Sequence, residues 1–208
     1  MVEAIAQVLP RLRAMRLRTY TRSRALPVAG KVALACGMAA LTGLAAQVRI
    51  PLGFTPVPIT GQVFAVLLAG VLCGRFYGGL SQAIYVGLGL AGLPWFAGFS
   101  GGLAIIAGPT GGYLIGFVLA AELIGYVSDR WVAARDFLPQ VGLMMAGVAV
   151  IHLCGVLQLT VWLGGDVQRA LAMGTVPFIL VDPAKAVLAA AISTALLPKT
   201  DAGEPDAG

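Results

Sequence analysis

The sequence predicts an all-α integral membrane protein with six transmembrane helices and two structured outer loops. Hydrophobic residues make up 59% of the chain and charged residues only 11%, whereas about a quarter of the residues in a soluble domain are charged. A helix that crosses a bilayer needs about 20 residues, so 208 residues accommodate six spans with short loops. The two-residue alternation of a membrane barrel is not seen, so the apolar segments are expected to be helices.

Six apolar segments follow one another along the chain and are expected to form one domain. The first begins late and continues for a full span, which favours a membrane anchor over a cleaved signal peptide. The second and third are short, and a tight loop at 75–79 joins them. The segments are 28–48, 60–74, 77–92, 112–127, 141–163 and 174–197, in a membrane domain of 28–197 between a basic segment, 1–27, and a polar tail, 198–208.

Charge asymmetry predicts the orientation of the spans. If the N-terminus is cytoplasmic, eleven lysines and arginines lie on the inner side and two on the outer side. Because cytoplasmic loops carry the excess of positive charge, both termini are expected inside. No basic patch interleaved with aromatics lies away from the membrane flanks, so these residues indicate topology and not nucleic-acid binding. The outer two are Arg49 and Arg169, and Lys185 lies within a span.

Two outer segments are rich in Gly and Pro and yet apolar: RIPLGFTPVPITGQ at 49–62 and GLPWFAGFSGGLAIIAGPTGG at 92–112. Backbone without helical hydrogen bonds is tolerated near a membrane only where it is buried in protein or lines a cavity. We therefore expect two loops that close over a pocket. Ordinary connectors carrying interfacial aromatic residues are the alternative.

The three cysteines lie in different apolar segments and form no CxxC motif. Cys36, Cys73 and Cys154 are therefore expected to be buried thiols and not parts of a disulfide or metal site.

The last span carries Asp182 and Lys185, three residues apart, with Pro183 between them. One interpretation is that Asp182 caps a helix starting at Pro183. However, a lysine in the first helical turn opposes the helix dipole, and each charge within a membrane costs at least ~2.5 kcal/mol. The pair is better explained as the polar end of an outward-facing pocket for a small ligand with both a hydrogen-bond donor and an acidic group.

Four stretches resemble signatures of the BioY family, the biotin-binding S components of energy-coupling factor (ECF) transporters. They are TPVPITGQVFAVLLAG at 55–70, GGLSQAIYVGLGLAGLPWFAGFSGG at 78–102, GPTGGYLIGFVLAA at 108–121 and PFILVDPAKA at 177–186. The resemblance implies high-affinity biotin capture at the outer side of a bacterial cytoplasmic membrane. It also implies a complex with a transmembrane coupling protein and two ATPases, and it matches the family's Asp-x-x-Lys to Asp182 and Lys185.

Biotin has a ureido ring with N–H donors, an apolar thioether bicycle and a valerate carboxylate. Asp182 is able to accept from a ureido N–H while Lys185 pairs with the carboxylate; the reverse, with Lys185 donating to the ureido oxygen, stays open. Any of the span aromatics can instead serve packing or the interfacial belt. Candidates for the apolar walls are Tyr85, Trp95, Phe99, Tyr113 and Trp162, and candidates for further hydrogen bonds are Thr60, Gln62 and Gln158.

The chain has no GxxxxGK[ST] motif, and GPTGGY lacks the lysine of a phosphate-binding loop. No cofactor is expected, and ATP hydrolysis is assigned to partner subunits. The first span has small-xxx-small spacing at Ala29/Ala33 and Ala35/Ala39. Small residues allow helices to approach closely, so this face is a candidate docking surface for the coupling protein. Packing inside the bundle is the alternative.

Two other functions have some support. GFSGG at 98–102 fits G-x-S-x-G, and Ser100 with His152 would make the dyad of a rhomboid-like intramembrane protease. However, Ser100 is expected in an outer loop and His152 in mid-span. Glu122 in an apolar segment raises the alternative of a proton-coupled carrier, although it is better placed as a residue approaching the inner interface.

Overall fold

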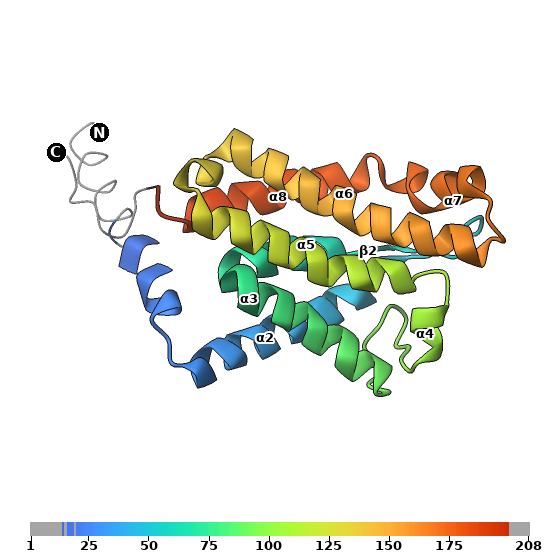
Figure 1. The fold of residues 1–208 in the computed structure, drawn as a ribbon, viewed down its shortest axis with the longest axis horizontal. Coiled ribbons are helices and arrows are strands. Elements are labelled where there is room, and N and C mark those ends of the chain that lie inside the picture. Colours follow the sequence, from blue (N-terminus) through green and yellow to red (C-terminus); the bar gives the residue numbers. More distant parts are fainter. Residues whose placement is uncertain (1–13, 15, 19, 200–208) are drawn as a thin grey trace.

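The computed structural model describes residues 14, 16–18 and 20–199 as a bundle of helices with irregular segments gathered at one end (Figure 1). The long helices are α2 (Val28–Gln47), α3 (Gln62–Leu90), α5 (Gly111–Arg130), α6 (Phe137–Trp162) and α8 (Val181–Leu196). The short elements are β1 (Arg49–Ile50), β2 (Ile59–Thr60), α4 (Ala104–Ala107), η1 (Val132–Arg135), α7 (Val167–Gly174) and η2 (Val176–Phe178).

Helix α3 turns back on itself at Gly74. This residue has φ 76° and ψ −175°, a conformation open to glycine and costly for other residues. A Cβ on Gly78 would lie only 3.0 Å from the Cα of Gly70, whereas eight residues of straight helix cover about 12 Å. The two arms, 62–73 and 75–90, are the short second and third spans expected from the sequence.

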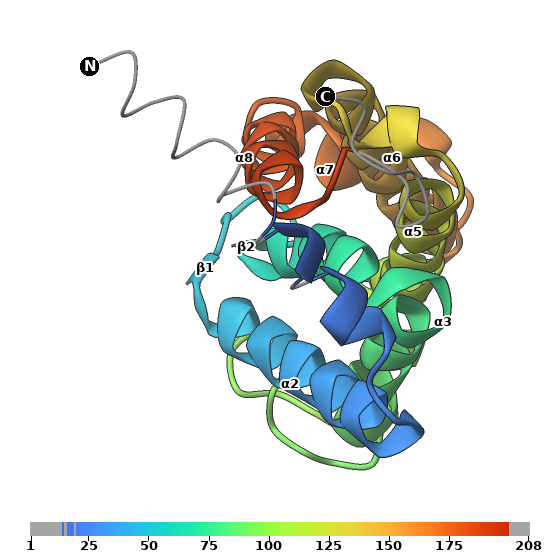
Figure 2. The ribbon, with the colours of Figure 1, turned by 90° about the vertical axis from the view of Figure 1, so that its left-hand side faces the viewer.

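The predicted class is confirmed. Four helices in the described part of the chain are long and apolar enough to cross a membrane, and α7–η2 with α8 makes a fifth as a pair bent by 47°. Since α3 contains two arms, the six expected helical segments are present. Helix α2 lies on the far side of α3 from α6 and α8 (Figures 1 and 2).

The sixth span differs from the prediction. We expected one helix over 174–197, but α7 ends at Gly174 and α8 begins at Val181, with η2 between them. Pro177, which cannot donate a backbone hydrogen bond, lies in this break. The capping interpretation of Asp182 is wrong, because Leu180 is the N-cap of α8 and Asp182 lies inside its first turn.

The two loops rich in Gly and Pro have more order than the sequence indicated. Strands β1 and β2 pair antiparallel, with Arg49 opposite Thr60 and Ile50 opposite Ile59, and so close the proline-rich loop between them. The 91–110 loop contains α4 and a bridge between Phe96 and Ser100. We call the end of the bundle with these two loops and α7 the loop end. The opposite end, where the segments before α2 and after α8 lie, is the terminal end (Figure 1).

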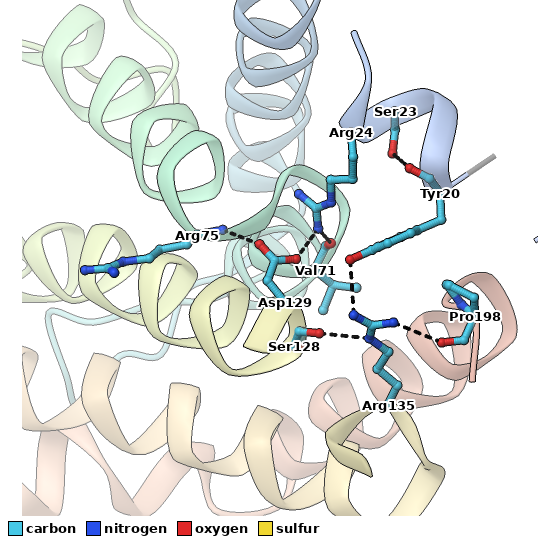
Figure 3. A network of polar contacts seen from close by, with 9 residues as sticks. All are labelled: Tyr20, Ser23, Arg24, Val71, Arg75, Ser128, Asp129, Arg135 and Pro198. Carbon is cyan, nitrogen blue, oxygen red and sulfur yellow. Dashed lines mark hydrogen bonds and ion pairs between the residues drawn. The ribbon is translucent and has the colours of Figure 1, made fainter. Parts of the chain in front are cut away.

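At the terminal end, a buried arginine holds several segments together. Arg135 of η1 is 3% exposed. Its guanidinium donates to the Ser128 carbonyl at 2.9 Å, to the Pro198 carbonyl at 3.3 Å and to the Tyr20 hydroxyl at 3.2 Å (Figure 3). One side chain thus joins the end of α5, the segment after α8 and the segment before α2.

A second arginine covers the bend of α3. Arg24 donates to Asp129 at 2.5 Å and to the carbonyl of Val71, and Asp129 also accepts from the backbone N–H of Arg75 (Figure 3). The carbonyl and N–H groups are those that the break at Gly74 leaves without helical partners. Residues 20–24 therefore lie across the terminal end of the bundle (Figure 2).

Arg135→Ala should lower the thermal unfolding temperature of the purified chain in detergent. Its carbonyl partners would lose a charged donor inside the protein, and each such bond is worth about 1.5–3 kcal/mol. The matched control is Arg130→Ala, at an exposed position near the same end. Equal losses in the two variants would contradict a structural role for Arg135.

Candidate functional site

A cavity lies at the loop end, with a volume of about 210 Å³. This is several times the ~30 Å³ that one water molecule occupies in the liquid. Its walls come from the β1–β2 loop, the first arm of α3, the 91–110 loop, α5, α6, η2 and α8. Its apolar lining includes Val57, Phe96, Ile105, Leu114, Phe117, Ile151 and Phe178. Its polar lining includes Arg49, Thr60, Gln62, Ser100, Thr110, Tyr113, His152, Asp182 and Lys185.

Asp182 is the most deeply buried charged group of the cavity, with a side chain 2% exposed. Its Oδ1 lies 2.7 Å from Lys185 Nζ, one helical turn along α8, and its Oδ2 lies 2.9 Å from His152 Nε2 on α6. A buried carboxylate is tolerated when both oxygens have partners of this kind. The first turn of α8 is thus joined to the middle of α6.

His152 extends this connection to the chain around α7. Its Nδ1 lies 3.0 Å from the carbonyl oxygen of Gly174, which also accepts from the Tyr113 hydroxyl at 2.7 Å. The imidazole packs against the rings of Tyr113 and Phe178. From the sequence, His152 is a candidate protease residue or, more simply, a packed or hydrogen-bonded residue of its span, and it is not among the predicted ligand-site residues. The signal that it belongs to the site was its presence as the single histidine in an apolar span.

On the wall formed by β2 and the start of α3, a chain of hydrogen bonds runs from the cavity into the core. Thr60 donates to Gln62 at 2.9 Å, and Gln62 donates to the Tyr85 hydroxyl at 2.6 Å. Tyr85 is fully buried, and Trp95 packs against its ring and donates to its backbone carbonyl. Thr60 and Gln62 therefore line the cavity, while Tyr85 and Trp95 support that wall from behind.

Three other residues named from the sequence lie apart from the cavity. Phe99 is 74% exposed, with φ 55°, and Trp162 is 52% exposed. Gln158 donates to the carbonyl of Gly108 at 2.8 Å and so ties the 91–110 loop to α6. The structure thus brings five of the ten predicted ligand-site residues together in the cavity lining: Thr60, Gln62, Tyr113, Asp182 and Lys185.

Arg49 was treated from the sequence only as a topology charge, yet it lines the cavity from β1. Its guanidinium lies against Gly98, where φ is 76° and any Cβ would overlap it. The β1–β2 loop and the 91–110 loop thus meet at an arginine packed against a glycine. The available signal was a single cation in an otherwise uncharged, proline-rich segment.

The residues of the two alternative functions have other partners. Ser100 donates to the Ala97 carbonyl at 3.1 Å, and both ring nitrogens of His152 are engaged with Gly174 and Asp182. Glu122 lies 3.3 Å from Arg75 and is half-exposed, outside the cavity lining. Among the described residues, Ser100 and His152 are therefore not paired as a dyad, and Glu122 has no part in the cavity lining.

All three cysteines are free thiols, and the prediction that they are buried is correct only in part. Cys73 is buried and Cys154 half-buried, but Cys36 is exposed on α2. Within the residues that the structure describes, no three His, Cys, Asp or Glu side chains are placed to hold a metal.

Comparison with known proteins identifies the family. The BioY family matches residues 15–201 of the chain. The chain belongs to the BioY family. The resemblance seen in the sequence motifs is therefore confirmed.

Individual BioY proteins are similar over most of their length. The chain is 46% identical over 145 residues to the probable biotin transporter BioY of Methanothermobacter thermautotrophicus, covering 66% of this chain and 92% of that one. It is 42% identical over 157 residues to the biotin transporter BioY of Thermotoga maritima, covering 76% and 89%. A crystal structure of the S-component for biotin from an ECF-type ABC transporter superposes with a TM-score of 0.74 at 29% identity, covering 83% and 94%.

Tyr85→Phe should destabilise the chain, because Gln62 would lose its buried acceptor. An unsatisfied buried donor costs about 1–3 kcal/mol. Thermal unfolding in detergent measures the effect, with Tyr126→Phe as control at an exposed tyrosine. A Tyr85→Phe variant as stable as the control would show that this hydrogen-bond chain does not support the cavity wall.

Proposed function

We propose that this chain is the biotin-binding S component of an ECF transporter and that it captures biotin in the cavity at the loop end. The observation that carries the proposal is the buried Asp182 carboxylate, paired with Lys185 and His152 at the edge of an otherwise largely apolar cavity. The BioY match and the structural similarity to an S-component for biotin support the choice of ligand. The chain is a transport component and not an enzyme.

The cavity offers a partner for each part of biotin. The thioether bicycle suits its apolar walls, and a buried carboxylate suits ureido N–H donors. Two cations are available for the valerate carboxylate: Lys185 on α8 and Arg49 on β1. If Lys185 meets the carboxylate, Asp182, whose Oδ1 lies 2.7 Å from Lys185 Nζ, is at the same end of the ligand, and the ureido ring lies against other polar residues of the lining. If Arg49 meets it, Asp182 and Lys185 together hold the ureido group.

The orientation proposed for the chain places both termini in the cytoplasm and the cavity toward the outside. The charge asymmetry of eleven to two supports this topology. The cavity is lined by residues of the loop end, and the terminal end lies at the other end of the bundle (Figure 1). Residues 28–197 then form the membrane substrate-binding unit of a bacterial cytoplasmic membrane protein, with a basic segment before it and a polar tail after it.

A coupling protein and two ATPases would supply the energy, and α2 is our proposed docking helix for the coupling protein. Only 28% of an 18-residue stretch of α2 is buried, against 67% of the corresponding stretch of α3. The four alanines named from the sequence divide between two faces: Ala29 and Ala33 are exposed, whereas Ala35 and Ala39 are fully buried against the bundle. We therefore assign the contact with the partner to the face that carries Ala29 and Ala33.

Asp182→Asn and Lys185→Ala should each weaken biotin binding by at least about tenfold, because about 1.4 kcal/mol corresponds to one decade and losing one member of a buried pair costs about 3–5 kcal/mol. Biotin affinity and thermal stability are measured together in detergent.

The matched control is Asp166→Asn. Asp166 is exposed at the same end and caps α7 by accepting from the Arg169 N–H, a role that Asn fills equally well. This control should bind like the parent chain. Parental affinity in Asp182→Asn would refute the assignment of the site.

Ala33→Trp should disrupt assembly with the coupling protein and ATPases while leaving biotin affinity within a few fold. A bulky side chain keeps two helices from approaching closely. Co-purification of the co-expressed subunits measures assembly, and Ala149→Trp on the exposed face of α6 is the control. Normal assembly of Ala33→Trp would show that the coupling protein does not dock on this face of α2.

A further inference from the structure

The last turn of α2 packs against the 91–110 loop. The indole of Trp95 lies over Gly43, where a Cβ would come within 3.0 Å of the ring. One turn later, at the end of α2, the half-buried side chain of Gln47 contacts the same loop. Because residues four apart lie on one face of a helix, these two positions make a single face of α2 on which the loop rests.

The amide group of Gln47 forms hydrogen bonds with the loop through both its nitrogen and its oxygen. The nitrogen donates to the backbone carbonyls of Trp95 and Phe96, each at 3.1 Å, and to the Gly43 carbonyl within α2. The oxygen accepts from the backbone N–H of Phe99 at 3.1 Å. A carbonyl only accepts and a backbone N–H only donates, so these partners fix the orientation of the amide.

The segment held by Gln47 is a tight turn, 96–100, that forms part of the cavity wall. Phe96 and Ser100 pair through their backbone groups across the turn. Both residues line the cavity together with Ala97, and Phe96 is only 3% exposed. A displacement of this turn would therefore open the cavity on one side.

The turn depends on Gln47 for its position. The residues beside the turn are fixed to the second arm of α3. The Trp95 indole donates to the Tyr85 carbonyl before the turn, and the Gly102 N–H donates to the Gly89 carbonyl after it. Between these two points, every backbone hydrogen bond that joins the turn to another segment of the described chain is made with Gln47.

The backbone of the turn is strained at Phe99. This residue has φ 55°, a left-handed conformation that is unfavourable for a residue with a Cβ. Its side chain is 74% exposed, so burial does not hold it there. Strained conformations of this kind persist where the surrounding structure imposes them, and they are frequent in segments that clamp a ligand. The hydrogen bond from the Phe99 N–H to Gln47 opposes the relaxation of this strain.

We propose that Gln47 is a positioning residue that holds the 96–100 turn against the cavity and thereby sets how slowly a bound ligand is released. Gln47 is outside the cavity lining, so it acts through the turn. When its hydrogen bonds break, Phe99 relaxes and the wall formed by Phe96 and Ser100 moves away. The identity of the ligand, biotin, rests on the proposed function; the role of Gln47 in holding the turn does not.

The first experiment needs no ligand. Gln47→Leu removes the amide while keeping a side chain of similar size. Hydrogen–deuterium exchange of the full chain in detergent should then be about tenfold faster for the amides of 96–100 and unchanged for those of α5. The matched control is Gln168→Leu, at an exposed position on α7, which should exchange like the parent. Parental exchange of the turn in Gln47→Leu would overturn the proposal.

The second experiment follows the release of radiolabelled biotin from preformed complexes after addition of excess unlabelled biotin. Release should be about tenfold faster in Gln47→Leu, since tenfold corresponds to about 1.4 kcal/mol, within the contribution of one or two hydrogen bonds. Only folded molecules hold biotin at the start, so a variant that merely folds less well keeps the parental rate. Gln168→Leu should also keep it, and a parental rate in Gln47→Leu would refute the effect on release.

A second variant at the same position tests the polarity of the contact. Gln47→Glu keeps an acceptor for the Phe99 N–H but places a carboxylate oxygen against the carbonyls of Trp95 and Phe96. It should therefore also release biotin faster than the parent. Release as slow as in the parent would show that the donated hydrogen bonds do not hold the turn.

Phe99→Asn should have the opposite effect. Asn adopts left-handed conformations several-fold more often than most residues with a Cβ, and it keeps the N–H that bonds Gln47. The strain of the held turn would fall, so release should be slower than in the parent, and faster release would contradict the proposal. Accelerated exchange in Gln47→Leu, with a parent chain that binds no biotin, would support the role of Gln47 and refute biotin as the ligand.

Discussion

The organisation of the loop end depends on a carboxylate that has almost no contact with solvent. Asp182 brings the first turn of α8 against the middle of α6 through His152, and His152 continues to the end of α7 through the Gly174 carbonyl. Tyr113 brings α5 to that same oxygen. Four helices thus converge on one anion and one carbonyl. An apolar residue at position 182 would fill the same space, but it would not fix the positions of these four helices relative to one another.

Charged side chains hold both ends of the bundle together, and close packing of small residues joins the two ends. At the terminal end, Arg24 and Arg135 satisfy backbone groups that the helix ends leave exposed. Between the ends, a Cβ on Gly116 would lie 2.8 Å from the Cα of Ile151, so α5 and α6 are nearly in backbone contact. This distribution suits a protein whose middle lies in hydrocarbon, where an unpaired polar group costs several kcal/mol.

Properties that depend on local composition were predictable from the sequence. Hydropathy located the helices, and the cost of intramembrane charge pointed to Asp182 and Lys185. The break before α8 was missed because η2 is as apolar as a span and only Gly174 and Pro177 mark it. His152 and Arg49 were missed because their roles come from partners 22 to 49 positions away.

Whether an aromatic residue faces the cavity depends on how its helix is rotated, which hydropathy does not reveal. Tyr113 faces the cavity, whereas Trp162 faces outward from α6. The position of an aromatic side chain in a loop is equally hard to predict from hydropathy, as Phe99 shows. Its backbone has φ 55° and its side chain is exposed, an outcome set by the turns on either side and not by its own apolar character.

The hairpin of α3 has a consequence for the surrounding lipid. Its second arm, 75–90, has 16 residues and so a length of about 24 Å, against about 30 Å for the hydrocarbon core of a bilayer. This arm exposes Phe76 near its start and Leu88 near its end. The apolar surface of this arm is therefore shorter than the hydrocarbon core beside it is thick. Such hydrophobic mismatch is relieved by local thinning of the bilayer, so the protein would carry a thinned patch of membrane along one side.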